Sequence, residues 1–252
     1  MATLTGRHAL VTGGGRGIGR ATAAQLVRAG ATVTVIGRQS GTLDETVAAG
    51  EAHFAETADV ADAAAISEAI AKTAIRQPID ILIANAGTAE SAPFVKSDGA
   101  LFRRMMDVNF MGTVHAIKAA LSGMTDRPYG RIVAVASTAG LKGYPYVSAY
   151  GAAKHAVVGL VRSLALELAH TCVTVNAVCP GFTDTDLVAS SIDYIMNRTG
   201  RSREQALAEL CRHNPQGRLV SPAEVADTVL WLCGEGSSAI TGQAIAVAGG
   251  EI

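Results

Sequence analysis

Short, almost wholly apolar runs alternate along this chain with longer segments whose apolar positions follow a helical period. Continuous apolar runs are typical of strands buried on both faces of a parallel sheet, and the longer segments are typical of amphipathic helices. The pattern therefore predicts an α/β fold: a single-domain, doubly wound parallel sheet of about seven strands, with helices on both faces, over residues 1–252. The expected strands are 9–12, 32–36, 53–57, 80–84, 131–136, 173–179 and 243–247.

The segment 184–214 has helical patterns but no strand-like run. Its second helix is expected to begin after Ser202, a residue type that caps helix N-termini well. We predict a helical lid near 184–214. The apolar positions that indicate its two helices are Leu187, Ile192, Ile195 and Met196, and then Ala206, Leu207, Leu210 and Cys211.

Composition and charge narrow the classes of protein that this chain can belong to. Its net charge of −1 provides no basic field for nucleic acid, so no nucleic-acid partner is expected. No apolar run approaches the roughly 18 residues that span a bilayer, and residues 1–7 lead into the first strand without a signal-peptide core. We therefore expect a cytoplasmic protein with no membrane partner.

The four cysteines do not suggest metal binding. They have no Cys-x-x-Cys spacing, so the sequence predicts neither a metal site nor a disulfide framework, and buried free thiols are expected instead. The cysteines are Cys172, Cys179, Cys211 and Cys233.

A glycine-rich turn follows the first expected strand and precedes a helical stretch at 20–29. Gly13 permits a tight turn, Gly17 lets backbone amides approach a pyrophosphate, and Gly19 lets the helix pack closely on the strand. The helix N-terminus favours an anion at the same place. The turn predicts a dinucleotide site, although glycine turns also end strands that bind no ligand.

Tyr150 and Lys154 stand four residues apart, so on a helix the phenol and the ammonium share one face. A free tyrosine has a pKa near 10, and a fixed cation beside it stabilises the phenolate and moves the pKa toward neutrality. The pair therefore predicts a general acid/base.

These motifs together resemble the short-chain dehydrogenase/reductase family, whose shorter members carry Thr-Gly-x-x-x-Gly-x-Gly, Asn-Ala-Gly, Ser, Tyr-x-x-x-Lys and Pro-Gly in that order. All are present in that order here, over essentially the whole chain. The resemblance implies a Rossmann-like fold and catalysis by Asn109, Ser137, Tyr150 and Lys154. It implies cofactor contacts from Gly13, Arg16, Gly17, Ile18, Gly19, Arg38, Asp59, Val60, Asn85, Ala86, Gly87, Tyr150, Lys154, Pro180, Gly181, Thr183 and Thr185.

The resemblance also assigns a role to each catalytic residue. Tyr150 exchanges a proton with the substrate oxygen, Ser137 positions that oxygen, and Lys154 binds the nicotinamide ribose. Asn109 holds a water in a helix. Ser137 as an ordinary turn serine and Asn109 as a structural asparagine remain alternatives. His155 and the other histidines are given no role.

The choice between NADP and NAD depends on the end of the second strand. NAD enzymes usually place an acidic residue there for the ribose hydroxyls, but Gly37 occupies that position and Arg38 follows it. Arg38 and Arg16 are suited to a 2′-phosphate, so NADP is favoured and NAD is the alternative. Asp59 is expected near the adenine, as a helix cap, or as both.

The resemblance is strongest to 3-oxoacyl-thioester reductases and 3-hydroxyacyl dehydrogenases. A small-alcohol, sugar-alcohol or hydroxybutyrate dehydrogenase is an alternative, and a non-catalytic dinucleotide-binding regulator is an alternative of another class. Lys142, Arg198 or Arg201 would serve a phosphate or thioester substrate. The family also implies a homotetramer or homodimer. The expected substrate contacts are Ser137, Ala139, Leu141, Tyr144, Tyr150 and Phe182, with Thr138 beside them.

Overall fold

The computed structural model describes residues 3–252, and its centre is one parallel sheet of seven strands in the order β3-β2-β1-β4-β5-β6-β7. All seven predicted strands are confirmed, each to within one residue at either end. They are β1 (His8–Thr12), β2 (Thr32–Gly37), β3 (Phe54–Thr57), β4 (Ile81–Ala84), β5 (Gly130–Val135), β6 (Val173–Pro180) and β7 (Ala244–Val247).

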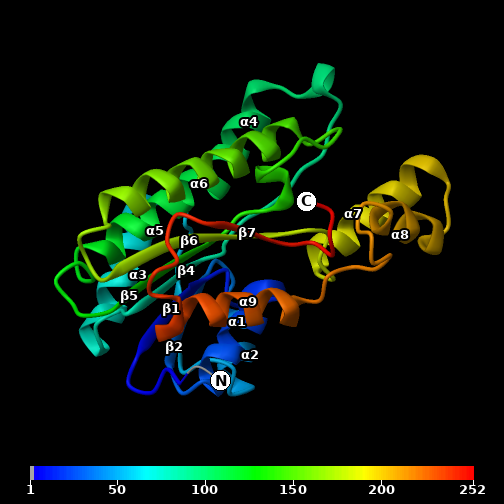
Figure 1. Ribbon diagram of the computed structural model, residues 1–252. Coiled ribbons are helices and arrows are strands. Elements are labelled where there is room, and N and C mark those ends of the chain that lie inside the picture. The colour runs from blue at the N-terminus through cyan, green and yellow to red at the C-terminus, as the bar shows by residue number, and fades with distance from the viewer. Residues whose placement is uncertain (1–2) are drawn as a thin grey trace.

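Helices cover both faces of the sheet, as the pattern predicts (Figure 1). One face is covered by α3 (Ala63–Arg76), α5 (Gly112–Leu121) and α6 (Ser148–Glu167), with α4 (Gly99–Met106) packed on α6. The other face is covered by α1 (Gly17–Arg28), α2 (Ser40–Ala48) and α9 (Pro222–Cys233). The doubly wound α/β fold is therefore confirmed.

The two faces of the sheet contribute to two separate apolar cores because successive strand residues point in opposite directions. Leu10 packs with Leu82 and Ile132 under α3, α5 and α6. Its neighbour Val11 packs with Val33 on the face that α1 and α9 cover. The continuous apolar runs in the sequence are explained by burial on both faces.

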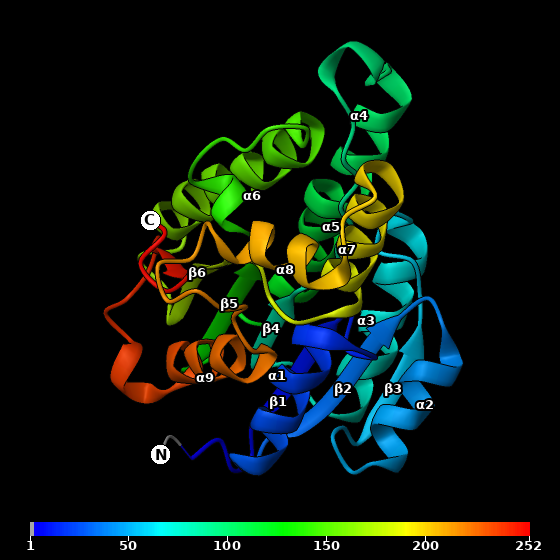
Figure 2. The same cartoon turned by 90° about the vertical axis from the view of Figure 1, so that its right-hand side faces the viewer.

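Both helices predicted for segment 184–214 are present, as α7 (Asp186–Thr199) and α8 (Arg203–Cys211). The Ser202 hydroxyl accepts a hydrogen bond from the Gln205 amide while the Gln205 side chain accepts one from the Ser202 amide, so Ser202 caps α8 as predicted. The two helices pack on each other through Val188, Ile192, Ala206 and Leu210. They lie beyond one end of the strands in Figure 1 and in front of the sheet in the turned view of Figure 2.

Three local expectations are wrong. The first helix begins at Gly17 rather than Arg20, because the glycine turn enters the helix directly. Asp62, not Asp59, caps α3, since its carboxylate accepts from the Ala64 and Ala65 amides. The four cysteines are free, but only two are fully buried: Cys172 is exposed and Cys211 is half-buried.

Within residues 3–252, the structure contains no helix that combines the length and apolarity needed to cross a membrane.

Candidate active site

The predicted motifs meet at one edge of the sheet because parallel strands end at the same edge. β1 pairs with β4, β4 with β5, and β5 with β6. Gly13, Asn85, Ser137 and Pro180 lie at or just after the ends of these strands. The candidate site is therefore built at the carboxyl edge.

The glycine turn has the shape that a bound pyrophosphate needs. Gly13 and Gly17 have positive φ angles of 66° and 53°, which glycine adopts without strain. A Cβ added at Gly19 would overlap the Gly13 carbonyl oxygen, so the start of α1 lies directly against the turn. No side chain caps the N-terminus of α1, and its first turn has no acidic residue. Its free N–H groups and dipole fit a phosphate.

Thr12 and Asn85 clamp this turn to the end of β4. The Asn85 side-chain amide donates to the Thr12 and Gly13 carbonyl oxygens at 2.9 and 3.2 Å. The Thr12 hydroxyl oxygen accepts from the amides of Asn85 and Ala86 at 3.0 and 3.1 Å. These hydrogen bonds hold the end of β1 to the end of β4.

Asn109 lies in a π-helical turn, Asp107–Met111, between α4 and α5. Such turns are rare and often mark functional sites. Its side-chain amide donates to the carbonyl oxygens of Thr88 and Met105 at 2.9 and 3.0 Å, and its oxygen accepts from the Thr88 amide at 3.2 Å. Asn109 is fully buried. It therefore fixes the loop after Gly87 through two hydrogen bonds to Thr88, and the third ties its side chain to α4.

Lys154 is buried within α6, with only 4% of the residue exposed. Its ammonium donates to the Val135 carbonyl oxygen at 2.9 Å and would lie 3.5 Å from a Cβ added at Gly87. Burial lowers the pKa of Lys154 to about 8, because removing water disfavours the charged form. The missing side chain at Gly87 leaves room beside the ammonium.

Tyr150 lies one turn earlier on α6, and the Lys154 ammonium is 5.7 Å from the centre of its ring. Burial raises the pKa of Tyr150, and hydrogen bonding with Ser137 opposes that rise. The expectation that Lys154 sets a lowered phenol pKa is therefore wrong for this arrangement, since Ser137 makes the opposing contact.

Ser137 follows β5 and begins the short 3-10 helix Thr138–Gly140, where its hydroxyl oxygen accepts from the Ala139 amide at 3.1 Å. This turn packs directly on α6, because a Cβ added at Gly140 would lie 2.7 Å from the Lys154 carbonyl oxygen. Ser137 is thus both a turn serine and a neighbour of Tyr150. The two interpretations of Ser137 are compatible.

The segment after β6 returns to the glycine turn. The Gly181 amide donates to the Val247 carbonyl oxygen at 3.0 Å, and the Thr183 hydroxyl donates to the Gly181 carbonyl oxygen at 3.0 Å. A Cβ added at Gly17 would lie 3.2 Å from the Thr185 methyl group. The predicted pyrophosphate and carboxamide segments are therefore in contact, while Ile18 packs partly into the core.

The adenosine end of the candidate site begins where β2 ends. The Gly13 amide donates to the Ile36 carbonyl oxygen at 2.7 Å, which brings Gly37 and Arg38 beside the glycine turn. Arg16 and Arg38 are both exposed, and an Arg38 nitrogen lies 3.9 Å from an Asp59 carboxylate oxygen. The Val60 side chain is buried against Gly112. Asp59 and Arg38 thus lie side by side at the adenosine end of the candidate site.

The expected substrate side contains an aromatic cluster that the sequence did not predict in full. Tyr144 meets Phe182 edge to face at 6.1 Å between ring centres, and His213 lies 5.7 Å from Tyr144 and 5.9 Å from Phe182. His213 follows α8, so the cluster joins the lid to the loop after Ser137. Leu141 packs partly against the core, and Ala139 is buried.

Lys142 is not available as a substrate anchor. Its ammonium lies 3.0 Å from a carboxylate oxygen of Glu251, a residue that the sequence analysis missed. Cys179 was also missed; it is buried next to Ser137 and Lys154, and burial raises the pKa of its thiol to about 11. Glu251 and Cys179 belong to no recognisable motif, so no local signal in the sequence identifies them as site residues.

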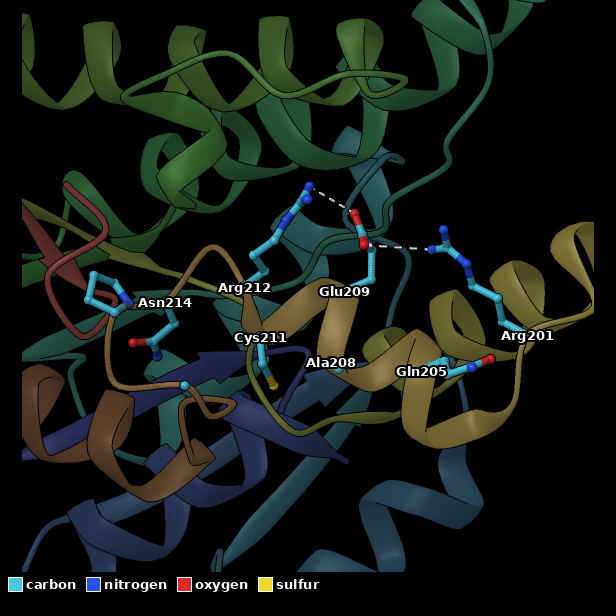
Figure 3. Close-up of a pocket in the computed structure, with 9 residues that line it drawn as sticks. Arg201, Gln205, Ala208, Glu209, Cys211, Arg212 and Asn214 are labelled. Carbon is cyan, nitrogen blue, oxygen red and sulfur yellow. Dashed lines mark ion pairs between the residues drawn. The ribbon is translucent and has the colours of Figure 1, made fainter.

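A hollow of about 850 Å³ lies on α8 and the turn 214–217, and Ser137, Tyr150 and Lys154 are not among the residues that line it (Figure 3). Glu209 forms ion pairs with Arg212 at 2.9 Å and Arg201 at 3.6 Å across it. Of the residues that line this hollow, only Arg201 is a candidate from the sequence for binding a phosphate or thioester substrate. The hollow is wide and open and contains no proton-transfer group like Tyr150, so the catalytic cluster, not this hollow, defines the candidate active site.

Comparisons with known proteins agree with this geometry. The profile of the short chain dehydrogenase family matches residues 7–212. The 2-(S)-hydroxypropyl-CoM dehydrogenase 3 of Xanthobacter autotrophicus is 38% identical over 95% of this chain and 94% of its own length. The 3-oxoacyl-(acyl-carrier-protein) reductase of Aquifex aeolicus is 37% identical over 98% of both chains. A crystal structure of actinorhodin polyketide ketoreductase with NADPH has a TM-score of 0.92 and 38% identity, covering 100% of this chain and 99% of that one.

The chain belongs to the short-chain dehydrogenase family. It is an oxidoreductase that uses a nicotinamide cofactor and interconverts a ketone and a secondary alcohol on a small-molecule substrate.

Proposed function

We propose that this enzyme is an NADP-preferring reductase of 3-oxoacyl substrates, working with residues 1–252 as one cofactor-binding and catalytic unit. The observation that carries the proposal is the geometry at α6: the Lys154 ammonium lies 5.7 Å from the centre of the Tyr150 ring, and Tyr150 hydrogen-bonds with Ser137. The substrate class is supported by the 3-oxoacyl reductase and the polyketide ketoreductase among its relatives.

In the proposed mechanism, the bound cofactor supplies a hydride to the carbonyl carbon. Tyr150 donates its phenolic proton to the carbonyl oxygen, so that an alcohol is released. The Ser137 hydroxyl hydrogen-bonds the same oxygen and fixes its position. Lys154 donates to the nicotinamide ribose and keeps a positive charge beside Tyr150 as the phenol loses its proton. After the transfer Lys154 would pass a proton to the Tyr150 phenolate and take one up from a water that Asn109 would hold.

The remaining predicted contacts hold the cofactor. Backbone amides at Gly17, Ile18 and Gly19 would bind the pyrophosphate, and Gly13, whose amide donates to the Ile36 carbonyl oxygen, would shape the turn around it. Asn85, Ala86 and Gly87 line the ribose side, and Asp59 accepts from the adenine amine, with Val60 contributing its backbone because its side chain is buried. The carboxamide contacts come from the segment that contains Pro180, Gly181, Thr183 and Thr185.

A second function has support from one observation. Lys142 is paired with Glu251, so it offers no free cation for the phosphate of a thioester carrier. This favours a short, uncharged ketone or alcohol over a carrier-bound substrate, whereas an anionic hydroxybutyrate-type substrate would need a cation other than Lys142. A non-catalytic regulator is disfavoured because Ser137, Tyr150 and Lys154 are all present and adjacent.

The test of the proposal is a panel of acetoacetyl-CoA, ethyl acetoacetate, acetoacetate and cyclohexanone with NADPH, followed by the loss of nicotinamide absorbance. Highest kcat/KM for acetoacetyl-CoA supports the 3-oxoacyl proposal. Highest kcat/KM for a short free ketone favours the second function, and cofactor binding without turnover of any compound contradicts both.

Cofactor preference provides a separate prediction. Gly37→Asp combined with Arg38→Ala is expected to shift the NADP/NAD ratio of kcat/KM toward NAD by more than about 10-fold, the effect of about 1.4 kcal/mol. The change removes a guanidinium that contributes about 1.5–3 kcal/mol per charge-assisted hydrogen bond and adds an acceptor for the ribose hydroxyls. A Cβ at position 37 would lie 3.3 Å from a Leu43 methyl group, whose flexible end can move.

The matched control is Arg28→Ala, since Arg28 is exposed at the far end of α1. It should leave the cofactor ratio unchanged. A wild-type enzyme that already prefers NAD would mean that Arg16 and Arg38 do not bind a 2′-phosphate.

We also propose a homotetramer or homodimer that uses the exposed small residues of α6, including Ala152 and Gly159. Light scattering at working concentration tests this, and the mass of a single chain would contradict it.

A further inference from the structure

The segment after β7 turns back toward the active site. Gly249 and Gly250 have positive φ angles of 62° and 93°, and a Cβ added at Gly249 would overlap Asn214. The two glycines therefore permit a turn that lies against the base of the lid. Glu251 follows this turn, and its side chain is only 1% exposed.

The buried Glu251 carboxylate has two partners on the loop after Ser137. One of its oxygens accepts from the Tyr144 hydroxyl at 2.5 Å and lies 3.0 Å from the Lys142 ammonium. Lys142 also donates to the Glu251 carbonyl oxygen at 3.3 Å. A buried carboxylate is costly unless it is paired, and removing either partner would leave an uncompensated charge. The contact therefore fixes both side chains.

The Tyr144 hydroxyl extends this contact to the residue next to Ser137. It lies 2.7 Å from the Thr138 hydroxyl. A phenol has one proton, and an ionised carboxylate only accepts, so Tyr144 donates to Glu251 and Thr138 donates to Tyr144. Burial and Glu251 together raise the pKa of Tyr144. Tyr144 thus stays protonated as a fixed wall of the site, while Tyr150 remains the group that transfers a proton.

Resting on the proposed function, we infer that Glu251 is a positioning residue that determines substrate specificity. It holds Tyr144 against Phe182 and His213, which joins the loop after Ser137 to the base of the lid. Glu251 also neutralises the charge of Lys142. The side of the site that Tyr144 forms therefore presents no free charge and receives an uncharged part of the substrate. Without the Glu251 carboxylate, the wall carries a free ammonium and favours an anionic substrate.

The experiment compares two ketones that differ in charge, the neutral ethyl acetoacetate and the anionic acetoacetate, with NADPH as the reductant. Three proteins are assayed: wild type, Glu251→Gln and the double variant Glu251→Gln/Lys142→Met. Glu251→Gln is expected to raise KM for the ester with little change in kcat. The kcat/KM ratio of acetoacetate to the ester should rise by about 5-fold or more, because one negative charge near the site is lost. Lys142→Met in the same chain should abolish that rise. Glu235→Gln is the control, because Glu235 is 84% exposed near the opposite edge of the sheet.

A Glu251→Gln enzyme with wild-type constants for both ketones would overturn the inference. An equal loss for both ketones with a lower Tm would also overturn it, since that is the signature of a merely structural residue. Failure of the proposed function is distinguishable, because it appears as a wild type that reduces neither ketone.

A second measurement needs no turnover. Glu251→Gln and Tyr144→Phe are combined in a double-mutant cycle read by denaturant unfolding. The two changes should be non-additive, with a coupling of about 5-fold or more in the unfolding equilibrium constant, the size of one net hydrogen bond. Additive effects would mean that Glu251 does not hold Tyr144 and would reject the inference.

Discussion

Replacing Tyr150 with phenylalanine is expected to lower kcat for ketone reduction by about 10²–10⁴-fold, the range that a positioned general acid contributes. The ring packs as before, so the cofactor dissociation constant should change little. The physical reason is that phenylalanine keeps the ring but lacks the hydroxyl that would give the proton to the substrate oxygen. Initial rates and fluorescence titration with NADPH measure the two quantities.

The control for this variant is Tyr146→Phe. Tyr146 lies in the same stretch of chain, but it is 65% exposed. It should keep wild-type kcat, which excludes a general effect of losing a phenol near the site. Turnover by Tyr150→Phe within a few-fold of wild type would mean that another group donates the proton.

The central strands β1, β4, β5 and β6 were predictable from sequence because they are buried on both faces and are mostly apolar, whereas the edge strands β3 and β7 are partly exposed. The runs that became β1, β4, β5 and β6 also predicted where the motifs would meet, since parallel strands share one carboxyl edge. The pairing of Tyr150 and Lys154 was predictable from helical spacing together with the glycine turn and the other motifs, since the spacing by itself is a weak signal. The roles of Ser137 and Asn109 needed the family resemblance, because a lone serine or asparagine has many uses.

The features that sequence did not predict depend on contacts between distant segments. Glu251 reaches Tyr144 across more than a hundred positions, and nothing near Glu251 signals this. His213 joins the aromatic cluster only because α8 ends beside Phe182. The capping residue of α3 was misassigned because Asp59 and Asp62 are both good caps, and only the backbone at the helix start decides between them.

Lys154→Ala is expected to weaken NADPH binding by about 10- to 100-fold, because a hydrogen bond from a charged group contributes about 1.5–3 kcal/mol. It should also lower kcat by about 10²-fold or more, since a fixed positive charge beside the reacting oxygen is lost. The two effects are separate: one is measured by fluorescence titration and the other by single-turnover rates at saturating cofactor. A loss of rate with unchanged cofactor affinity would contradict the proposed contact with the ribose.

The pH dependence of wild type and Lys154→Ala then isolates the charge on Lys154. Burial lowers the pKa of Lys154 in the folded protein to about 8, below its ordinary value of 10.5. The ammonium is therefore lost as pH rises through about 8, and wild-type kcat/KM for reduction should fall above that pH, whereas the variant should lack this step. The free energy of unfolding is expected to change in the opposite direction from kcat/KM over the same pH range. Between pH 8 and 10.5 the unfolded chain binds more protons than the folded one, so the free energy of unfolding of wild type should rise relative to that of the variant. Urea unfolding at pH 7 and pH 9.5 measures this difference, and a constant difference between the two proteins would show that Lys154 is not a buried ammonium.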